Sequence, residues 1–98
     1  MDNLHDLVTI NDIYTIRRKL KKGLNPNETI GSSQVTPLHV AAQFNRKEAA
    51  QILLESGADL KARTSPQGLT PLDIAINFQH FEMMRLLDRG KTKVLRAS

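Results

Sequence analysis

The sequence repeats itself at an interval of 34 residues, and this periodicity constrains the fold more than any single residue does. The identical pairs at this interval are Thr36 and Thr70, Pro37 and Pro71, Leu38 and Leu72, Ala41 and Ala75, Phe44 and Phe78, Glu48 and Glu82, and Leu53 and Leu87. In the other direction Leu38, His39, Leu54 and Gly57 correspond to Leu4, His5, Leu20 and Gly23. A repeat of this length indicates stacked copies of one supersecondary unit, each burying its apolar face on its neighbours.

The second copy predicts two short helices. Thr36 can cap the first, because its hydroxyl accepts a backbone N–H of the next turn while Pro37 takes the first helical position, where no donor is needed. Residues 47–55 predict the second helix, with alanines and leucines at helical spacing. Gly57 is expected to end it in a left-handed conformation, which glycine tolerates best.

These motifs identify a likeness to a known family. Thr36-Pro37-Leu38-His39 is followed by Ala41-Ala42 and then by Leu53-Leu54-Glu55-Ser56-Gly57-Ala58-Asp59, and this combination resembles the ankyrin repeat family over nearly the whole chain. The resemblance implies an all-α solenoid of stacked antiparallel helix pairs joined by β-hairpin-like fingers. The first copy lacks the Thr-Pro start, and Asp88-Arg89-Gly90 ends the third copy early.

We therefore expect one domain, residues 1–98, with repeats at about residues 2–35, 36–69 and 70–90 and a basic tail at residues 91–98 that is frayed or weakly helical. The terminal copies should deviate from the pattern because their outer faces meet water.

The first and third copies predict two further helix pairs. In the first, a helix at about residues 4–9 precedes one at residues 12–22 that Asn11 would cap. In the third, helices are expected at about residues 71–78 and 80–87. Their apolar side chains should pack on the second repeat: Leu72, Ala75, Ile76, Phe81, Met84 and Leu87.

Composition excludes several classes of protein. The chain has no cysteine, which rules out disulfides, thiolate metal sites and cysteine catalysis. No apolar run approaches the roughly 18 residues that span a bilayer, and the first residues are polar and acidic where a signal peptide is basic and then apolar. We expect a cytoplasmic protein without a membrane partner.

Catalytic or metal-binding chemistry is not expected. His5 and His39 occupy the same repeat position, and together with His80 they suit structural hydrogen bonds to backbone groups. The carboxylates are scattered, no nucleophile lies in a recognisable motif, and no glycine-rich loop is placed to hold phosphate. We predict no catalytic residue, no cofactor and no metal, hence no enzyme.

The basic run at residues 17–22 raises the possibility of nucleic-acid binding. It lacks interleaved aromatic residues and follows helical periodicity. A solvated helix face is the preferred interpretation, with no nucleic-acid partner.

The apolar residues that the fold does not need are more informative about function. In ankyrins the two positions after Ala-Ala face the concave groove. In this chain the second of these positions is Ile10 in the first copy, Phe44 in the second and Phe78 in the third. Val35 and Leu69, just ahead of each Thr-Pro, are expected to lie next to the two phenylalanines in the groove. With the finger tips they give the candidate partner-binding set: Ile10, Ser33, Val35, Gln43, Phe44, Gln67, Leu69, Asn77 and Phe78. Alternatively, the rings only brace adjacent repeats.

The sequence thus predicts a non-enzymatic protein–protein interaction module, monomeric when free, that binds through its groove and fingers. One alternative is a small bacterial-type immunity or inhibitor protein that blocks the active site of a toxin or enzyme. Nucleic-acid binding through the basic patches is the other.

Overall fold

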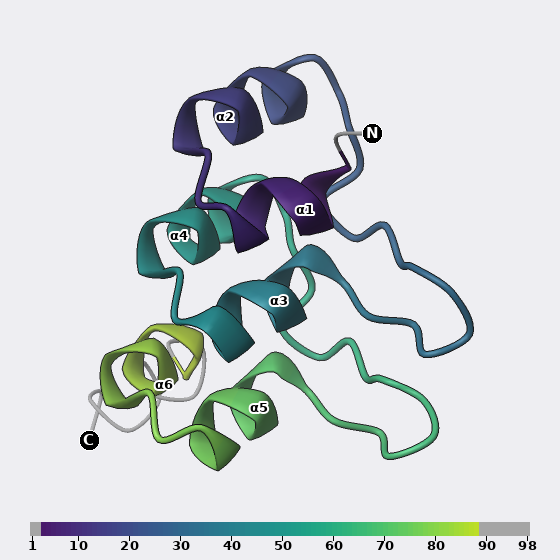
Figure 1. Ribbon diagram of the computed structural model, residues 1–98, viewed down its shortest axis with the longest axis vertical. Coiled ribbons are helices and arrows are strands. Elements are labelled where there is room, and N and C mark those ends of the chain that lie inside the picture. Colours follow the sequence, from purple (N-terminus) through teal and green to yellow (C-terminus); the bar gives the residue numbers. More distant parts are fainter. Residues whose placement is uncertain (1–2, 89–98) are drawn as a thin grey trace, which may run out of the picture.

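The computed structural model describes residues 3–88, and its helices form three antiparallel pairs (Figure 1). The pairs are α1 (Leu4–Thr9) with α2 (Ile13–Lys21), α3 (Pro37–Phe44) with α4 (Lys47–Glu55), and α5 (Pro71–Asn77) with α6 (Phe81–Leu87). Figure 1 shows α1, α3 and α5 stacked in an inner column, α2, α4 and α6 in an outer one, and the fingers projecting to one side. The predicted all-α repeat architecture is confirmed.

The inner helix α3 begins at the predicted cap Thr36, and α5 begins at Thr70, the equivalent residue one repeat later. The Thr36 hydroxyl accepts a hydrogen bond from the His39 N–H at 3.3 Å, and the Thr36 N–H donates to the His39 ring in return at 3.1 Å. Thr70 and Asp73 form the same reciprocal box. Two otherwise unpaired donors are satisfied in each box, which fixes where each inner helix starts.

The predicted cap of α2 is wrong by one residue. The side chain of Asp12, not of Asn11, accepts the Thr15 N–H, at 3.2 Å. Asn11 has a φ of 61°, and Asn45 and Gln79 have 58° at the same repeat position. A residue in this left-handed conformation lies in the turn between the paired helices, and the next residue, Asp12, with a φ of −86°, is the N-cap.

The end of α4 agrees with the sequence. The helix spans Lys47–Glu55, and Gly57 follows with a φ of 100°. The Gly57 N–H donates to the Leu54 carbonyl and the Ala58 N–H to the Leu53 carbonyl. These bonds satisfy carbonyls that the helix end leaves without partners.

The core is aliphatic and rich in alanine. Small side chains let neighbouring helices approach closely, and five alanines in the interior of the stack are fully buried: Ala41, Ala42, Ala49, Ala50 and Ala75. Leu38 and Leu53 fill the space between them. Each helix pair therefore buries its apolar face on the next pair.

The fingers are less regular than β-hairpins. Within residues 3–88 the only β-type pairing is one isolated bridge between Ile30 and Val35. Successive fingers are nevertheless joined, because the Ser65 N–H donates to the Ser33 carbonyl at 2.9 Å. The Asn27 side chain also donates to the Gly57 carbonyl at 3.1 Å.

The third repeat departs from one expectation. Ile76 and Phe81 were expected to pack on the second repeat, yet both side chains are exposed. Both line a surface hollow at the outer end of the third repeat, together with Leu72 and Met84. The expectation of a frayed or weakly helical tail concerns residues outside the described range.

Candidate functional site

Three large apolar side chains lie at the ends of the three inner helices. Ile10 follows α1, Phe44 is the last residue of α3, and Phe78 follows α5. Their side chains are 67%, 44% and 52% exposed. A ring that braces two repeats would be buried between them, so the structure places this row, hereafter the apolar row, on the surface.

Val35 and Leu69 do not lie beside the apolar row, contrary to the sequence interpretation. Each precedes the N-cap of an inner helix, while the phenylalanine ends that helix. Eight helical residues, as in α3, span about 12 Å. Both side chains are half-buried, and Figure 1 shows that the fingers join the opposite end of the inner helices. The candidate set is therefore split into two parts.

Phe78 is held in place by a neighbour that the sequence analysis did not select. Its ring stacks on the His80 ring with centroids 5.8 Å apart and an interplanar angle of 25°. The His80 ring nitrogen Nδ1 lies 2.9 Å from the Ala42 carbonyl oxygen of the preceding repeat. Phe78 thus loses less side-chain freedom on contact with a partner than an unsupported ring would.

Arg46 is a second residue that sequence reasoning missed. It begins the turn into α4, and its Nη2 donates to the Thr9 carbonyl at 2.7 Å. Thr9 ends α1, where a cation complements the helix dipole. Arg46 therefore fixes the first repeat to the second directly beside Ile10.

The remaining candidate residues lie at exposed positions. Gln43 and Asn77 precede the phenylalanines, and Ser33 and Gln67 lie at the finger tips. The second tip is braced by Arg63, whose Nη1 donates to the Gly68 carbonyl at 2.9 Å. The tips and the apolar row are separate surfaces at the two ends of the inner helices.

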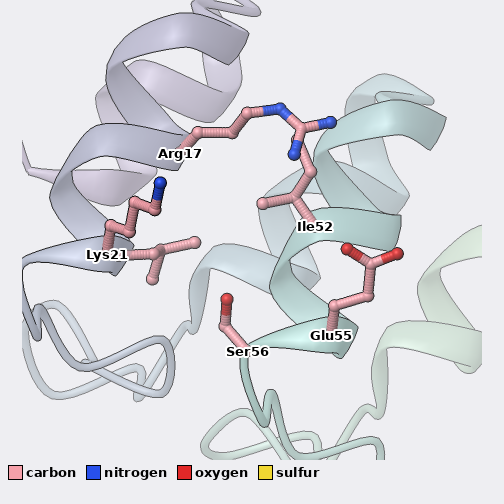
Figure 2. A pocket seen from close by; sticks show the side chains of 6 residues that line it. Arg17, Lys21, Ile52, Glu55 and Ser56 are labelled. Carbon is pink, nitrogen blue, oxygen red and sulfur yellow. The ribbon is translucent and has the colours of Figure 1, made fainter.

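A hollow of about 240 Å³ lies between the outer helices α2 and α4 (Figure 2). Arg17 and Lys21 line it from α2, and Glu55 from the end of α4. It is smaller than typical ligand pockets of about 300–1,000 Å³. Its small size and its opposite charges indicate a water-filled depression of the surface and not a ligand-binding site.

The histidines make the structural hydrogen bonds that the sequence predicts. Nε2 of His5 lies 2.7 Å from the Val35 carbonyl oxygen, and Nε2 of His39 lies 2.9 Å from that of Leu69. Burial lowers the pKa of His39, although the contact with the Leu69 carbonyl opposes the shift. Each histidine connects one repeat to another.

Among the described residues, no group of three or more histidine, aspartate or glutamate side chains is placed to hold a metal ion. None of the described helices is long and apolar enough to cross a membrane.

Comparison with known proteins gives a consistent family. A model of ankyrin repeats matches residues 4–96 as three copies. The chain is 37% identical over 86 residues to "ARF GTPase-activating protein Git" of Drosophila melanogaster, an alignment that covers 87% of this chain and 12% of that protein. It is 35% identical over 80 residues to "Potassium channel KOR2" of Oryza sativa subsp. japonica, covering 82% of this chain and 11% of the channel.

A third relative is "Neurogenic locus Notch protein" of Drosophila melanogaster, 35% identical over 78 residues, which is 80% of this chain and 3% of that protein. The chain thus spans about an eighth or less of the length of these three relatives.

Proposed function

Because the chain belongs to the ankyrin repeat family, whose repeats typically mediate protein–protein interactions, we propose that it binds another protein through the apolar row and the finger tips. The coarse assignment, a non-catalytic repeat module, follows from the family. The surface used and the mode of action are the proposal.

The observation that carries the proposal is the exposure of the apolar row. Ile10, Phe44 and Phe78 recur at one repeat position and expose large apolar side chains. Exposed apolar residues gathered on one surface are typical of interaction sites. Aromatic side chains on a rigid support are typical binding anchors.

The proposed mechanism is steric. The hydrogen bonds from His39 and Arg46 fix the repeats to one another, so a partner meets a preformed surface and pays little ordering cost. Such a surface covers, recruits or orients the partner. The inhibitor reading is one case of this mechanism, in which the covered region is an active site.

Nucleic-acid binding through α2 is the competing proposal. Its basic residues include Arg18, whose guanidinium lies 5.8 Å from the centroid of the Tyr14 ring. Phosphate contacts make binding to any duplex fall steeply with salt. The protein-binding proposal predicts no salt-dependent retention of the chain on duplex DNA or RNA.

A comparative capture experiment tests the proposal. The immobilised chain and a Phe44→Ala/Phe78→Ala variant are incubated with the same extract, and captured proteins are quantified by mass spectrometry. At least one protein should be enriched on the unchanged chain and lost from the variant. Arg17→Ala/Arg18→Ala serves as the matched control and should retain it. Identical captured sets on all three would overturn the role of the apolar row.

We further propose that the chain acts in the cytoplasm and is monomeric when free. Sedimentation velocity over a range of concentrations tests the second part, and a concentration-dependent rise in mass would contradict it.

A further inference from the structure

The apolar row is bordered by amide side chains in all three repeats. Each member of the row is followed by asparagine or glutamine, and the two phenylalanines are also preceded by one. These residues, hereafter the row amides, are Asn11, Gln43, Asn45, Asn77 and Gln79. All five are exposed. Consecutive Cα atoms lie about 3.8 Å apart, so the row amides border the apolar side chains directly.

The row amides are available to a bound partner. Within residues 3–88 none of their side chains makes a hydrogen bond to another protein group. Backbone geometry accounts for Asn11 and Asn45, since asparagine tolerates their positive φ of 61° and 58°. It does not account for Gln79, which has the same φ of 58° although glutamine is not among the residue types enriched in this conformation.

Ionic contact plays no part at these positions. The residues at 9–11, 43–45 and 77–79 include no charged side chain, although 24% of the chain is charged. The residue that follows in each repeat already makes a contact inside the fold: Asp12, Arg46 and His80. The apolar row and its amides therefore offer a partner apolar contact and hydrogen bonds.

The spacing of the row limits the conformation of a bound segment. Helix α3 contacts α1 on one side and α5 on the other, and packed helices lie about 8–10 Å apart. A polyproline II segment returns a side chain to the same face every third residue, about 9.3 Å further on. An α-helix does so every seventh residue, at about 10.5 Å. A β-strand does so after about 6.6 or 13 Å, which does not match.

We propose that the apolar row binds a polyproline II segment of the partner that carries an apolar side chain at every third residue. The row amides favour this conformation over a helix. A helix bonds its own backbone groups internally and would leave the amides unused. A polyproline II backbone has no internal hydrogen bonds, so it needs new partners when it loses water on binding. Grooves lined by aromatic side chains recognise such segments in other domains.

This inference rests on the proposed partner site and specifies its partner, and a peptide selection tests the two separately. The probe is a phage library of random peptides of about 16 residues, which span about 24 Å as a helix. The immobilised chain should enrich peptides with apolar residues at i, i+3 and i+6, and Phe44→Ala/Phe78→Ala should lose them.

The other outcomes of the selection are distinct. Peptides with apolar residues at i, i+7 and i+14 that the phenylalanine variant loses would overturn the polyproline II proposal and leave the partner site standing. Recovery of no peptide would also overturn the proposal, while capture of proteins from an extract still tests the site. Selected peptides that bind the variant equally well would overturn the apolar row itself as the partner site.

The row amides allow a second test with a matched control. Asn45→Gly/Gln79→Gly removes two amides, and glycine accepts the positive φ of both residues. Affinity for a selected peptide should fall about tenfold or more, as expected for two lost hydrogen bonds, with the circular dichroism unchanged. Gln34→Gly is the control, because Gln34 has a φ of 57° but lies in the first finger. Unchanged affinity in the double variant, or an equal loss in the control, would overturn the proposal.

Proline substitution in the selected peptide tests its bound conformation. Proline fixes φ near the polyproline II value and interrupts a helix. It is placed at one or the other of the two residues between apolar positions, and at least one of the two peptides should keep its affinity. A loss of tenfold or more in both would overturn the proposal.

Discussion

Nε2 of His39 lies 2.9 Å from the carbonyl oxygen of Leu69, the residue just before the cap of the next inner helix. His5 makes the same contact with Val35 one repeat earlier, at 2.7 Å. In His39 the other ring nitrogen accepts the Thr36 N–H at 3.1 Å. Nε2 must therefore carry the proton and donate to Leu69, so the neutral ring both caps its own helix and joins two repeats.

The first prediction concerns pH. Burial lowers the pKa of His39, so the folded state disfavours the charged ring, which also cannot accept the Thr36 N–H. The free energy of unfolding should be unaffected by this group above its ordinary pKa of about 6.5 and should fall as the pH drops from there through the lowered folded pKa. Urea titrations at a series of pH values measure this dependence.

His39→Gln is the matched variant for this prediction. It removes the titrating ring while keeping a polar side chain, so it should be less stable at neutral pH and should show a shallower loss of stability in the same pH window. Equal slopes in the unchanged chain and the variant would show that other groups cause the acid dependence.

The second prediction concerns Gly57, whose φ is 100°. A Cβ added there meets no atom within 4 Å, so any cost arises from the backbone conformation alone. Gly57→Val should destabilise the fold by about 1–3 kcal/mol. Chemical denaturation with a common m-value measures the loss.

Gly57→Asn is the control, because asparagine tolerates positive φ better than a β-branched residue does. It should cost clearly less than Gly57→Val. A valine variant as stable as the parent chain would contradict the strained position of this helix end.

The third prediction is that the repeats depend on one another for stability. Ala42 and Ala50 of the second repeat are fully buried, and their helices α3 and α4 contact α5 and α6 of the third repeat. Deleting residues 70–98 should leave a largely unfolded fragment, visible as loss of helical circular dichroism. A fragment that stays monomeric and unfolds cooperatively would show that the first two repeats form a stable unit.

The sequence was sufficient for the parts of the fold that depend on local signals. The caps at Thr36 and Thr70, the bounds of α4 and the positive φ of Gly57 all follow from residue types that suit one backbone geometry. The Asn11 cap failed because asparagine suits both an N-cap and a left-handed turn. The residue type alone therefore did not show whether Asn11 caps α2 or lies in the turn before it.

The placement of the site could be predicted only in part. The sequence indicated that Phe44 and Phe78 share one repeat position, but it placed Val35 and Leu69 beside them, although an inner helix separates the two groups. The contacts of Arg46 with Thr9 and of His80 with Ala42 join residues more than 30 positions apart. Such contacts depend on how the repeats stack, which no local pattern specifies.

The apolar row gives the most direct test of the central claim, that its exposed side chains bind a partner and do not brace the repeats. Once a partner is identified, its affinity and the melting temperature are measured for Phe44→Ala, Phe78→Ala and the control Arg18→Ala. The account predicts an affinity loss of about tenfold or more for each phenylalanine variant, equivalent to about 1.4 kcal/mol. It also predicts little change in melting temperature, and neither effect for Arg18→Ala. A stability loss of about 3–5 kcal/mol, as for a buried phenylalanine, with affinity intact would contradict the claim.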